Sequence, residues 1–206
     1  MKSIIIEKVE QAVGILNEFG VDAWLTFVRE TTESGDTVLP LILGQNLTWQ
    51  SALLITRSGQ RIAIVGNYEA DAVKATGAWS EVVPYVQGIR TALIETLQRI
   101  DPKSIAINYS RDDVKADGLS HGMFLLLHDH LADTSYRDRL VGADQIINAL
   151  RGRKTAGEVA RIRRAIQTTD EIFRAIPEFA RLWRSELEIA EYVRRLAAER
   201  RVGLAW

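Results

Sequence analysis

The segment between Arg29 and Trp49 carries the side chains best suited to bind a ligand. It is polar and directly follows the apolar run at 22–28, which predicts a strand, and polar residues just after a strand of an α/β sheet often face a ligand. Arg29 begins the segment together with Glu30, and its guanidinium can bind a carboxylate through two parallel hydrogen bonds. The alternative is structural: Arg29 and Glu30 form a surface network, and Trp49, which ends the segment, packs in the core.

Neither the three histidines nor the acidic pair Asp101 and Asp112 supports a metal site. His121 and His128 lie seven residues apart on one face of a predicted helix, about 10.5 Å along its axis, which is too far for one ion, and His130 points elsewhere. We expect surface or interface roles for all three. Asp101 and Asp112 bracket a predicted strand, and an extended stretch of that length separates its ends by about 35 Å, so turn and helix-cap roles are expected. No catalytic residue and no metal ligand is therefore assigned.

Composition excludes several other kinds of chemistry. The 206 residues include no cysteine, which rules out disulfides, thiolate metal sites and a cysteine nucleophile and is compatible with a reducing compartment. Neither a G-x-S-x-G nucleophile motif nor a glycine-rich phosphate-binding loop occurs. No apolar run approaches the roughly 18–20 residues of a membrane span, and the apolar run near the N-terminus is too short for a signal peptide. The expectation is a cytoplasmic protein with no membrane partner.

Hydrophobic periodicity predicts a mixed α/β fold for the first 150 residues. The run 51–65 predicts a hairpin around Ser58 and Gly59, so the sheet is not wholly parallel. Pro84 cannot donate a backbone hydrogen bond and places its strand at an edge or a bulge. Asp117 is expected to cap the helix that follows it and Gly118 to form a tight turn, with an interface role as the alternative. The expected helices cover 5–19 (closed by Gly20), 68–76, 88–100, 117–131 and 142–152, and the other strands cover 22–28, 81–86 and 104–108.

The pattern becomes purely helical after residue 153. Two capping boxes and an apolar stripe predict two long helices. Pro177 ends or kinks the first helix, and Gly203 closes the second. Because apolar stripes need a surface to pack on, we infer that this stretch begins a second domain, most of which is missing from the chain. The capping boxes pair Thr155 with Glu158 and Ser185 with Glu188, and the stripe consists of Val159, Ile162, Ile166, Thr169, Phe173 and Ile176.

Charge is distributed unevenly along the chain. Residues 1–150 contain 13 basic and 19 acidic side chains, whereas residues 151–206 contain 13 and 8, and the net charge of the whole is −1. A sensor domain fused to a DNA-binding helix pair is one interpretation of the basic helices. However, interspersed glutamates repel phosphate, and the aromatic residues do not alternate with the arginines as a base-stacking surface requires. We expect a solvated or interdomain face that packs against the acidic first domain, and no nucleic-acid partner.

Several segments together resemble the creatinase/prolidase/aminopeptidase P ("pita-bread") metallopeptidase superfamily. The stretch LRGRKTAGEVARIRRAIQTTDEIF (150–173) is similar to the join between the N-terminal and catalytic domains of that family. The segments SELEIAEYV (185–193), SALLITRSGQRIAIVGNYEAD (51–71) and AINYSRDDVKADGLSHG (106–122) resemble further parts of it. The resemblance covers essentially the whole chain, with the segments in matching order.

The resemblance implies a ribonuclease H-like, mixed-sheet creatinase-type N-terminal domain over 1–150 and the first helices of a truncated metallopeptidase domain over 151–206. In the complete enzyme, two divalent metal ions (Mn, Co or Zn) are held by two Asp, one His and two Glu, and a metal-bridging hydroxide attacks peptides with proline in the second position. This chain stops before any of these ligands. We therefore expect it to bind no metal and to be inactive alone.

The resemblance also bears on the ligand-binding segment. In several family members this part of the N-terminal domain reaches the active site of a partner subunit, which makes Arg29, Glu30 and Trp49 substrate-binding candidates in a homodimer, Trp49 by stacking on a proline ring. The favoured interpretation is the N-terminal fragment of a metal-dependent Xaa-Pro dipeptidase or aminopeptidase, which serves dimerisation and shapes the substrate entrance. The alternative is a non-catalytic, peptidase-like module that binds a protein partner.

Overall fold

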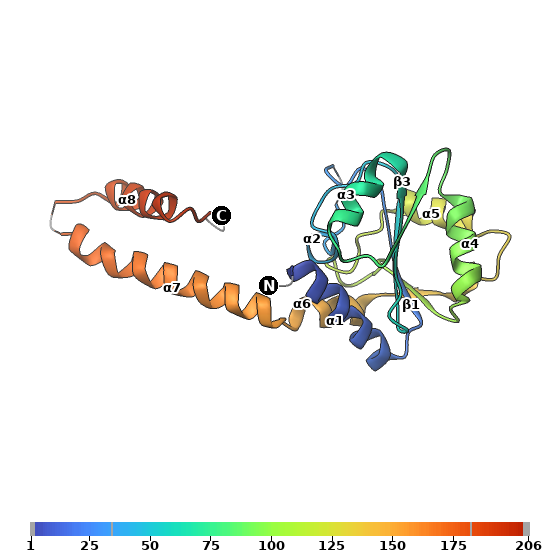
Figure 1. Cartoon of the computed structure of the whole chain (residues 1–206). Coiled ribbons are helices and arrows are strands. Elements are labelled where there is room, and N and C mark those ends of the chain that lie inside the picture. The colour runs from blue at the N-terminus through green and yellow to red at the C-terminus, as the bar shows by residue number, and fades with distance from the viewer. Residues whose placement is uncertain (1–2, 34, 182, 204–206) are drawn as a thin grey trace. The chain divides into compact units, whose positions relative to one another are not determined.

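The computed structural model describes residues 3–33, 35–181 and 183–203. The chain divides into two compact units, residues 1–155 and residues 156–206 (Figure 1). The first unit is built on a mixed sheet with helices, and the second contains two long helices. The predicted α/β class of the first 150 residues is confirmed.

The sheet of the first unit has six strands in the order β4-β3-β2-β1-β5-β6. The pairs β1–β2 and β2–β3 are antiparallel and the other pairs are parallel, which confirms the predicted hairpin and the mixed sheet. Pro84 lies in the edge strand β4, as its missing N–H requires. The strands are β1 (Ala23–Val28), β2 (Ser51–Thr56), β3 (Arg61–Gly66), β4 (Glu81–Tyr85), β5 (Ile105–Ile107) and β6 (Leu140–Gly142).

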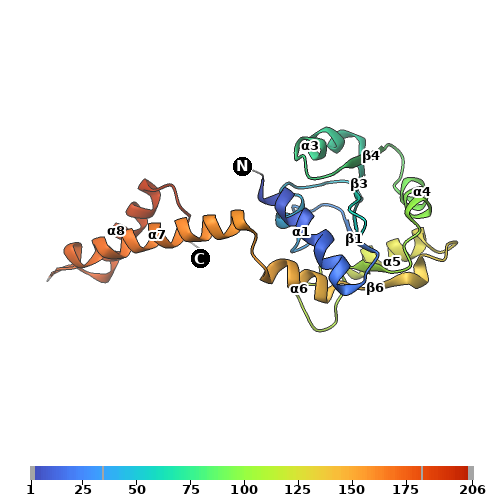
Figure 2. The same cartoon turned by 60° about the horizontal axis from the view of Figure 1, so that its bottom comes forward.

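Helices cover both faces of this sheet. One face packs against α1, α2, α3 and α6 and the other against α4 and α5, as Figures 1 and 2 show. Alternate residues of each central strand therefore enter two different cores: Trp24 and Val28 enter the first, and Leu25 and Phe27 the second. The helices are α1 (Ile4–Phe19), α2 (Leu39–Ile42), α3 (Ala70–Ala75, after the 3-10 turn Asn67–Glu69), α4 (Arg90–Ile100), α5 (His121–His130, with the 3-10 turn Arg137–Arg139 beyond it) and α6 (Asp144–Gly152).

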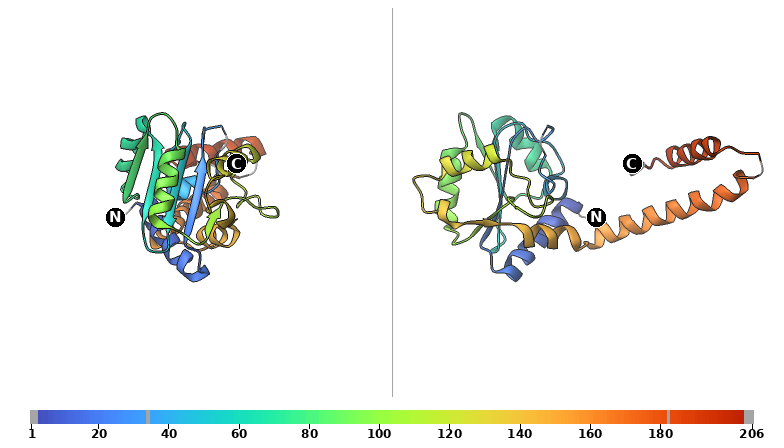
Figure 3. Two further views of the ribbon diagram at one scale, coloured as in Figure 1. Left: turned by 90° about the vertical axis from the view of Figure 1, so that its right-hand side faces the viewer. Right: turned by 180° about the vertical axis from the view of Figure 1, so that it is seen from behind.

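A buried lysine joins α1 to the end of α6. Lys8 is completely buried, and its Nζ donates to the carbonyl oxygens of Leu150 (2.5 Å) and Arg153 (2.8 Å). The last carbonyls of a helix have no partner within the helix and carry partial negative charge, so an ammonium group is well placed there. Figure 3 shows α1, in blue, beside α6, in the golden orange of residues 144–152. Gly20 closes α1 with a left-handed φ of 68°, as predicted.

Two predictions about the entrance to α5 are wrong. The helix begins at His121, and its N-cap is Ser120, whose side chain accepts from the amide of Met123. The Asp117 carboxylate instead accepts from the amide of Ser110 at 3.3 Å. Gly118 has no left-handed φ. Its lack of a side chain instead allows the backbone to lie close to the side chain of Asp36. The backbone before α5 is held instead by the Leu119 amide, which donates to the carbonyl of Asn108.

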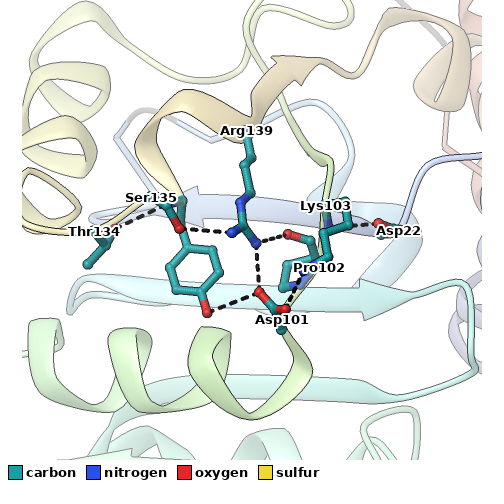
Figure 4. A network of polar contacts seen from close by, with 8 residues as sticks. Asp22, Asp101, Pro102, Lys103, Thr134, Ser135 and Arg139 are labelled. Carbon is teal, nitrogen blue, oxygen red and sulfur yellow. Dashed lines mark hydrogen bonds and ion pairs between the residues drawn. The ribbon is translucent and has the colours of Figure 1, made fainter.

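Asp101 closes α4, which confirms its predicted helix-cap role. It adopts a left-handed φ of 39° at the C-cap, and its carboxylate pairs with Lys103 and with Arg139 Nη1 (2.7 Å; Figure 4). Arg139 also donates to the carbonyl of Pro102 and to Ser135 Oγ, both at 2.8 Å. The strand β6, which the sequence analysis missed, begins directly after Arg139. The cluster therefore holds the turn before β6 against the end of α4.

The unit formed by residues 156–206 contains α7 (Ala156–Phe179) and α8 (Glu186–Glu199). The capping box of Ser185 and Glu188 is confirmed, whereas that of Thr155 and Glu158 stays a prediction. Pro177 does not stop α7 at once: the helix continues to Phe179. Gly203 does not close α8, because that helix already ends at Glu199 with Arg200 as its C-cap. Within the described ranges, no helix is long and apolar enough to cross a membrane.

The first prediction concerns the charge of Asp101. Lys103 and Arg139 lower the pKa of its carboxyl to about 2, from a usual value of 3.8. A lowered pKa stabilises the folded state above the unfolded-state pKa, and this contribution disappears as the pH falls through the folded-state value. Asn tolerates a left-handed φ, so Asp101→Asn keeps the backbone conformation of the C-cap. The substitution should lower the melting temperature at pH 6 by a few degrees at most, because the ion pair of Asp101 with Lys103 is exposed. The difference from wild type should narrow towards pH 2.5 in thermal unfolding followed by circular dichroism. If the melting temperatures of the variant and the wild type differed by the same amount at both pH values, the charge of Asp101 would not contribute to stability.

The second prediction concerns the apolar stripe of α7. Phe173 is 63% exposed and Ile166 is 55% exposed, although both belong to the stripe. Exposed apolar area of this kind favours association, so we expect concentration-dependent sedimentation of the 206-residue chain. The double substitution Ile166→Glu and Phe173→Glu should abolish the association, whereas Gln167→Glu, at an exposed position of the same helix, should not. A monodisperse monomer at all concentrations would contradict the prediction.

Candidate functional site

The candidate segment 29–49 returns to the strand end from which it starts. The Glu30 amide donates to the Thr48 carbonyl (3.0 Å) and the Thr31 amide to the Leu47 carbonyl (2.8 Å), which extends the β1–β2 pairing. Its two ends are therefore adjacent, and Arg29 and Glu30 lie at the same end of β1 and β2 as Trp49. Between them the segment forms the short helix α2, which the sequence analysis missed.

Asn108 is the polar centre on which this segment rests. It follows β5, is 1% exposed, and its side-chain Nδ2 donates to Asp36 Oδ2 at 2.6 Å and to Thr26 Oγ1 at 3.2 Å. Its Oδ1 accepts from Trp24 Nε1 at 2.6 Å. Three of the hydrogen-bonding positions of this amide are thus used inside the protein. One side chain therefore links β5, β1 and the candidate segment.

Asp36 is a carboxylate held almost entirely away from water. It is 3% exposed, and its Oδ1 accepts from the Val38 amide at 3.0 Å. Burial raises the pKa of Asp36, and the hydrogen bonds from Asn108 and Val38 oppose that shift. No lysine or arginine of the described ranges pairs with it. Gly118 is needed beside it, because a Cβ there would lie 2.2 Å from the carboxyl carbon of Asp36.

A cavity of about 560 Å³ lies beside Asp36 within the candidate segment. This volume falls in the range of small-molecule pockets. Both polar and apolar groups contribute to its walls, but the carboxylate of Asp36 is already occupied by two donors. The cavity is lined by Thr31, Asp36, Leu39, Pro40, Gln45 and Asn46, among others.

The three predicted substrate-binding residues lie at the surface of the segment. Arg29 and Glu30 are exposed, and Glu30 has a left-handed φ of 44°. In the part of the chain that the structure describes, no ion pair joins the side chains of Arg29 and Glu30. Trp49 is 37% exposed, and its ring lies 6.0 Å from that of Tyr85 and 6.2 Å from that of Tyr68. Arg29, Glu30 and Trp49 are thus accessible to a ligand at the same end of the β1–β2 pair.

The histidines are dispersed over α5. His121 is exposed at the start of the helix, and His128 Nδ1 accepts from Arg137 Nε at 3.0 Å. His130 Nε2 lies 3.3 Å from Gln50 Oε1, and burial lowers the pKa of His130. In the part of the chain that the structure describes, no group of three or more His, Asp or Glu side chains could hold a metal ion. The implied divalent ions therefore do not fit the residues described here.

Comparisons with known proteins identify the fold. A scan against protein-family models found no match, and a search of curated proteins found none either. Among solved structures, an Xaa-Pro dipeptidase from Bacillus anthracis aligns with a TM-score of 0.60 and 17% identity, over 95% of this chain and 49% of that one. An X-Pro aminopeptidase from Thermotoga maritima MSB8 aligns with a TM-score of 0.59 and 20% identity, over 93% of this chain and 49% of that one. An aminopeptidase P from Streptococcus thermophilus gives 0.53 and 13%, over 72% of this chain and 99% of that one.

These similarities are at the level of the fold. The chain shares its fold with parts of solved Xaa-Pro peptidases, and the fold expected from the resemblance to the creatinase, prolidase and aminopeptidase P superfamily is confirmed. The chain spans about half the length of the Bacillus and Thermotoga proteins, which it matches over most of its own length.

The third prediction tests whether the Asp36 environment holds the segment. Gly118→Ala places a methyl group against the buried carboxylate and should lower the free energy of unfolding by about 1–3 kcal/mol, measured by urea denaturation. It should also shift the Val38 amide resonance, because Val38 donates to Asp36. The matched control is Gly14→Ala in α1, which meets no atom within 4 Å. Equal effects of the two substitutions would refute the assignment.

Proposed function

We propose that this chain is the N-terminal part of a metal-dependent Xaa-Pro dipeptidase or aminopeptidase. The observation that supports this most strongly is the alignment of 93–95% of the chain with about half of two such peptidases. In this proposal the chain provides dimerisation and shapes the substrate entrance in a homodimer, and a catalytic part with two divalent ions lies outside the residues described here. The proposal also includes a cytoplasmic location, because a sequence without cysteine is compatible with a reducing compartment.

Arg29, Glu30 and Trp49 are the residues through which the chain takes part in this activity. All three are exposed at one end of the β1–β2 pair. The segment to which they belong is held by the buried hydrogen bond between Asn108 and Asp36. In the proposed homodimer they contact the substrate bound in the partner subunit. Arg29 binds the carboxylate of the peptide, which a guanidinium does with two parallel hydrogen bonds, and Trp49 stacks on the proline ring.

The fourth prediction follows from this division of roles. The 206-residue chain should hydrolyse no Xaa-Pro dipeptide, whereas a polypeptide extended past residue 206 should do so with added manganese or cobalt. In that extended protein Arg29→Ala should raise KM about tenfold or more, which corresponds to the loss of one charged hydrogen bond, and leave kcat nearly unchanged. Lys74→Ala, a change at an exposed lysine that pairs only with Asp71 in the described ranges, is the control.

Two outcomes would overturn the proposal. Hydrolysis by the 206-residue chain itself would place the catalytic groups within it. An extended polypeptide that lacks the two Asp, one His and two Glu of the family and binds a protein partner would instead support the non-catalytic, peptidase-like module.

A further inference from the structure

An open cluster of aromatic rings lies beyond the end of the candidate segment. It consists of Trp49, Tyr68 and Tyr85, and its rings are inclined to one another by 53° and 70° rather than stacked. Tyr68 is 86% exposed, so much of its ring faces solvent. Exposed large aromatic side chains cost free energy in water and often mark a binding surface.

The backbone around this cluster is arranged to keep Trp49 in place. A Cβ at Gly66 would lie 2.9 Å from two ring atoms of Trp49, so the indole lies directly over a glycine. Tyr85, the strand partner of Gly66, donates its OH to the carbonyl of Gln50 at 2.6 Å, which fixes the phenol ring. Two of the three rings are thus positioned by contacts that leave little freedom.

A carboxylate with an incomplete set of partners accompanies the rings. Glu69 Oε1 accepts from the amide of Thr48, next to Trp49, at 2.5 Å. Its Oε2 is buried and has no hydrogen-bond partner in the described ranges, and no described lysine or arginine pairs with Glu69. A buried carboxylate oxygen without a cation is costly. Burial, together with the negative charge of Glu69, raises the pKa of Tyr85 to about 12.

The space beside the rings suits a small group. A cavity of about 230 Å³ is lined by Trp49, Gln50, Tyr85, Gln87, Gly88 and Ile89, which is smaller than the pocket of a typical drug-sized ligand. Arg90 follows this lining, but its guanidinium is bound to Asp133 (2.8 Å) and to the carbonyl of His130 (3.2 Å). Glu69 therefore keeps a negative charge with which neither Arg90 nor any other lysine or arginine of the described ranges forms an ion pair.

We propose that Trp49, Tyr68 and Tyr85, together with Glu69, form a binding site for an organic ammonium group. Aromatic faces attract cations through the ring quadrupole, and several rings around one ammonium group form the aromatic cage that recognises such ligands. The carboxylate supplies the charge that distinguishes a cation from a neutral group of the same shape. This site depends only on residues 48–89 and holds whether or not the chain belongs to a peptidase.

The fifth prediction compares choline with 3,3-dimethyl-1-butanol, its uncharged isostere, in binding to the 206-residue protein. Titration calorimetry and the indole resonance of Trp49 provide the readouts. Choline should bind roughly tenfold more tightly than the isostere. Equal binding of the two, or tighter binding of the uncharged N-acetylprolinamide, would overturn the ammonium assignment. Because the proposed function requires only that Trp49 stack on a proline ring, the N-acetylprolinamide result would leave it intact.

Substitutions locate the site. Glu69→Gln should remove most of the preference for choline while leaving binding of the neutral isostere, and Tyr68→Leu should weaken choline binding several-fold without affecting folding, since Tyr68 is almost fully exposed. Gly66→Ala should displace the indole and weaken binding. Tyr109→Leu is the matched control, because Tyr109 is 38% exposed and stacks on Phe124 instead. Choline binding unchanged by Tyr68→Leu would place the ligand elsewhere and refute the proposal.

Discussion

The hydrogen bond between Asn108 and Asp36 is the contact on which the arrangement of the candidate site depends. It joins residues 72 positions apart in the sequence and lies where water does not reach. In a buried site a hydrogen bond is strong, and the loss of this one would leave Asp36 Oδ2 and one N–H of Asn108 without a partner. Further bonds support the same segment, including Arg151 Nη1 to the carbonyl of Thr37 at 3.0 Å. The exposed Arg29 and Trp49 therefore belong to a segment that these hydrogen bonds hold in place.

Local sequence patterns were sufficient for most of the fold. The hairpin around Ser58 and Gly59, the edge strand with Pro84 and the end of α1 at Gly20 each depend on a backbone property of one or two residues, and each is confirmed. The strand β6 has only three residues, too few for a periodic pattern, and α2 has four. The start of α5 was predicted too early because Asp117 and Ser120 are both good caps, and only the three-dimensional contacts decide between them.

The polar centre of the site could not be predicted for a different reason. Asn108 and Asp36 are ordinary residues of polar stretches in the sequence, and the side-chain partners of Asn108 lie 72 to 84 positions away, in β1 and in the candidate segment. The same holds for Lys8, whose acceptors lie 142 and 145 residues away. In contrast, Arg29 and Glu30 begin and Trp49 ends the polar segment that follows the predicted strand, and the resemblance points to the same segment. The structure places all three residues at one end of the β1–β2 pair. Their role with a substrate stays a proposal.

Native-state hydrogen exchange of the wild-type chain tests the central claim, that the Asn108–Asp36 contact fixes the candidate segment. The amides of Val38, Thr31 and Leu47 report on that segment, and those of Leu25 and Leu54 report on the β1–β2 core. If the contact fixes the segment, all five amides exchange only through unfolding of the first unit, with the same free energy. Exchange of Val38, Thr31 and Leu47 through a local opening of much lower free energy, while Leu25 and Leu54 remain protected, would contradict the account.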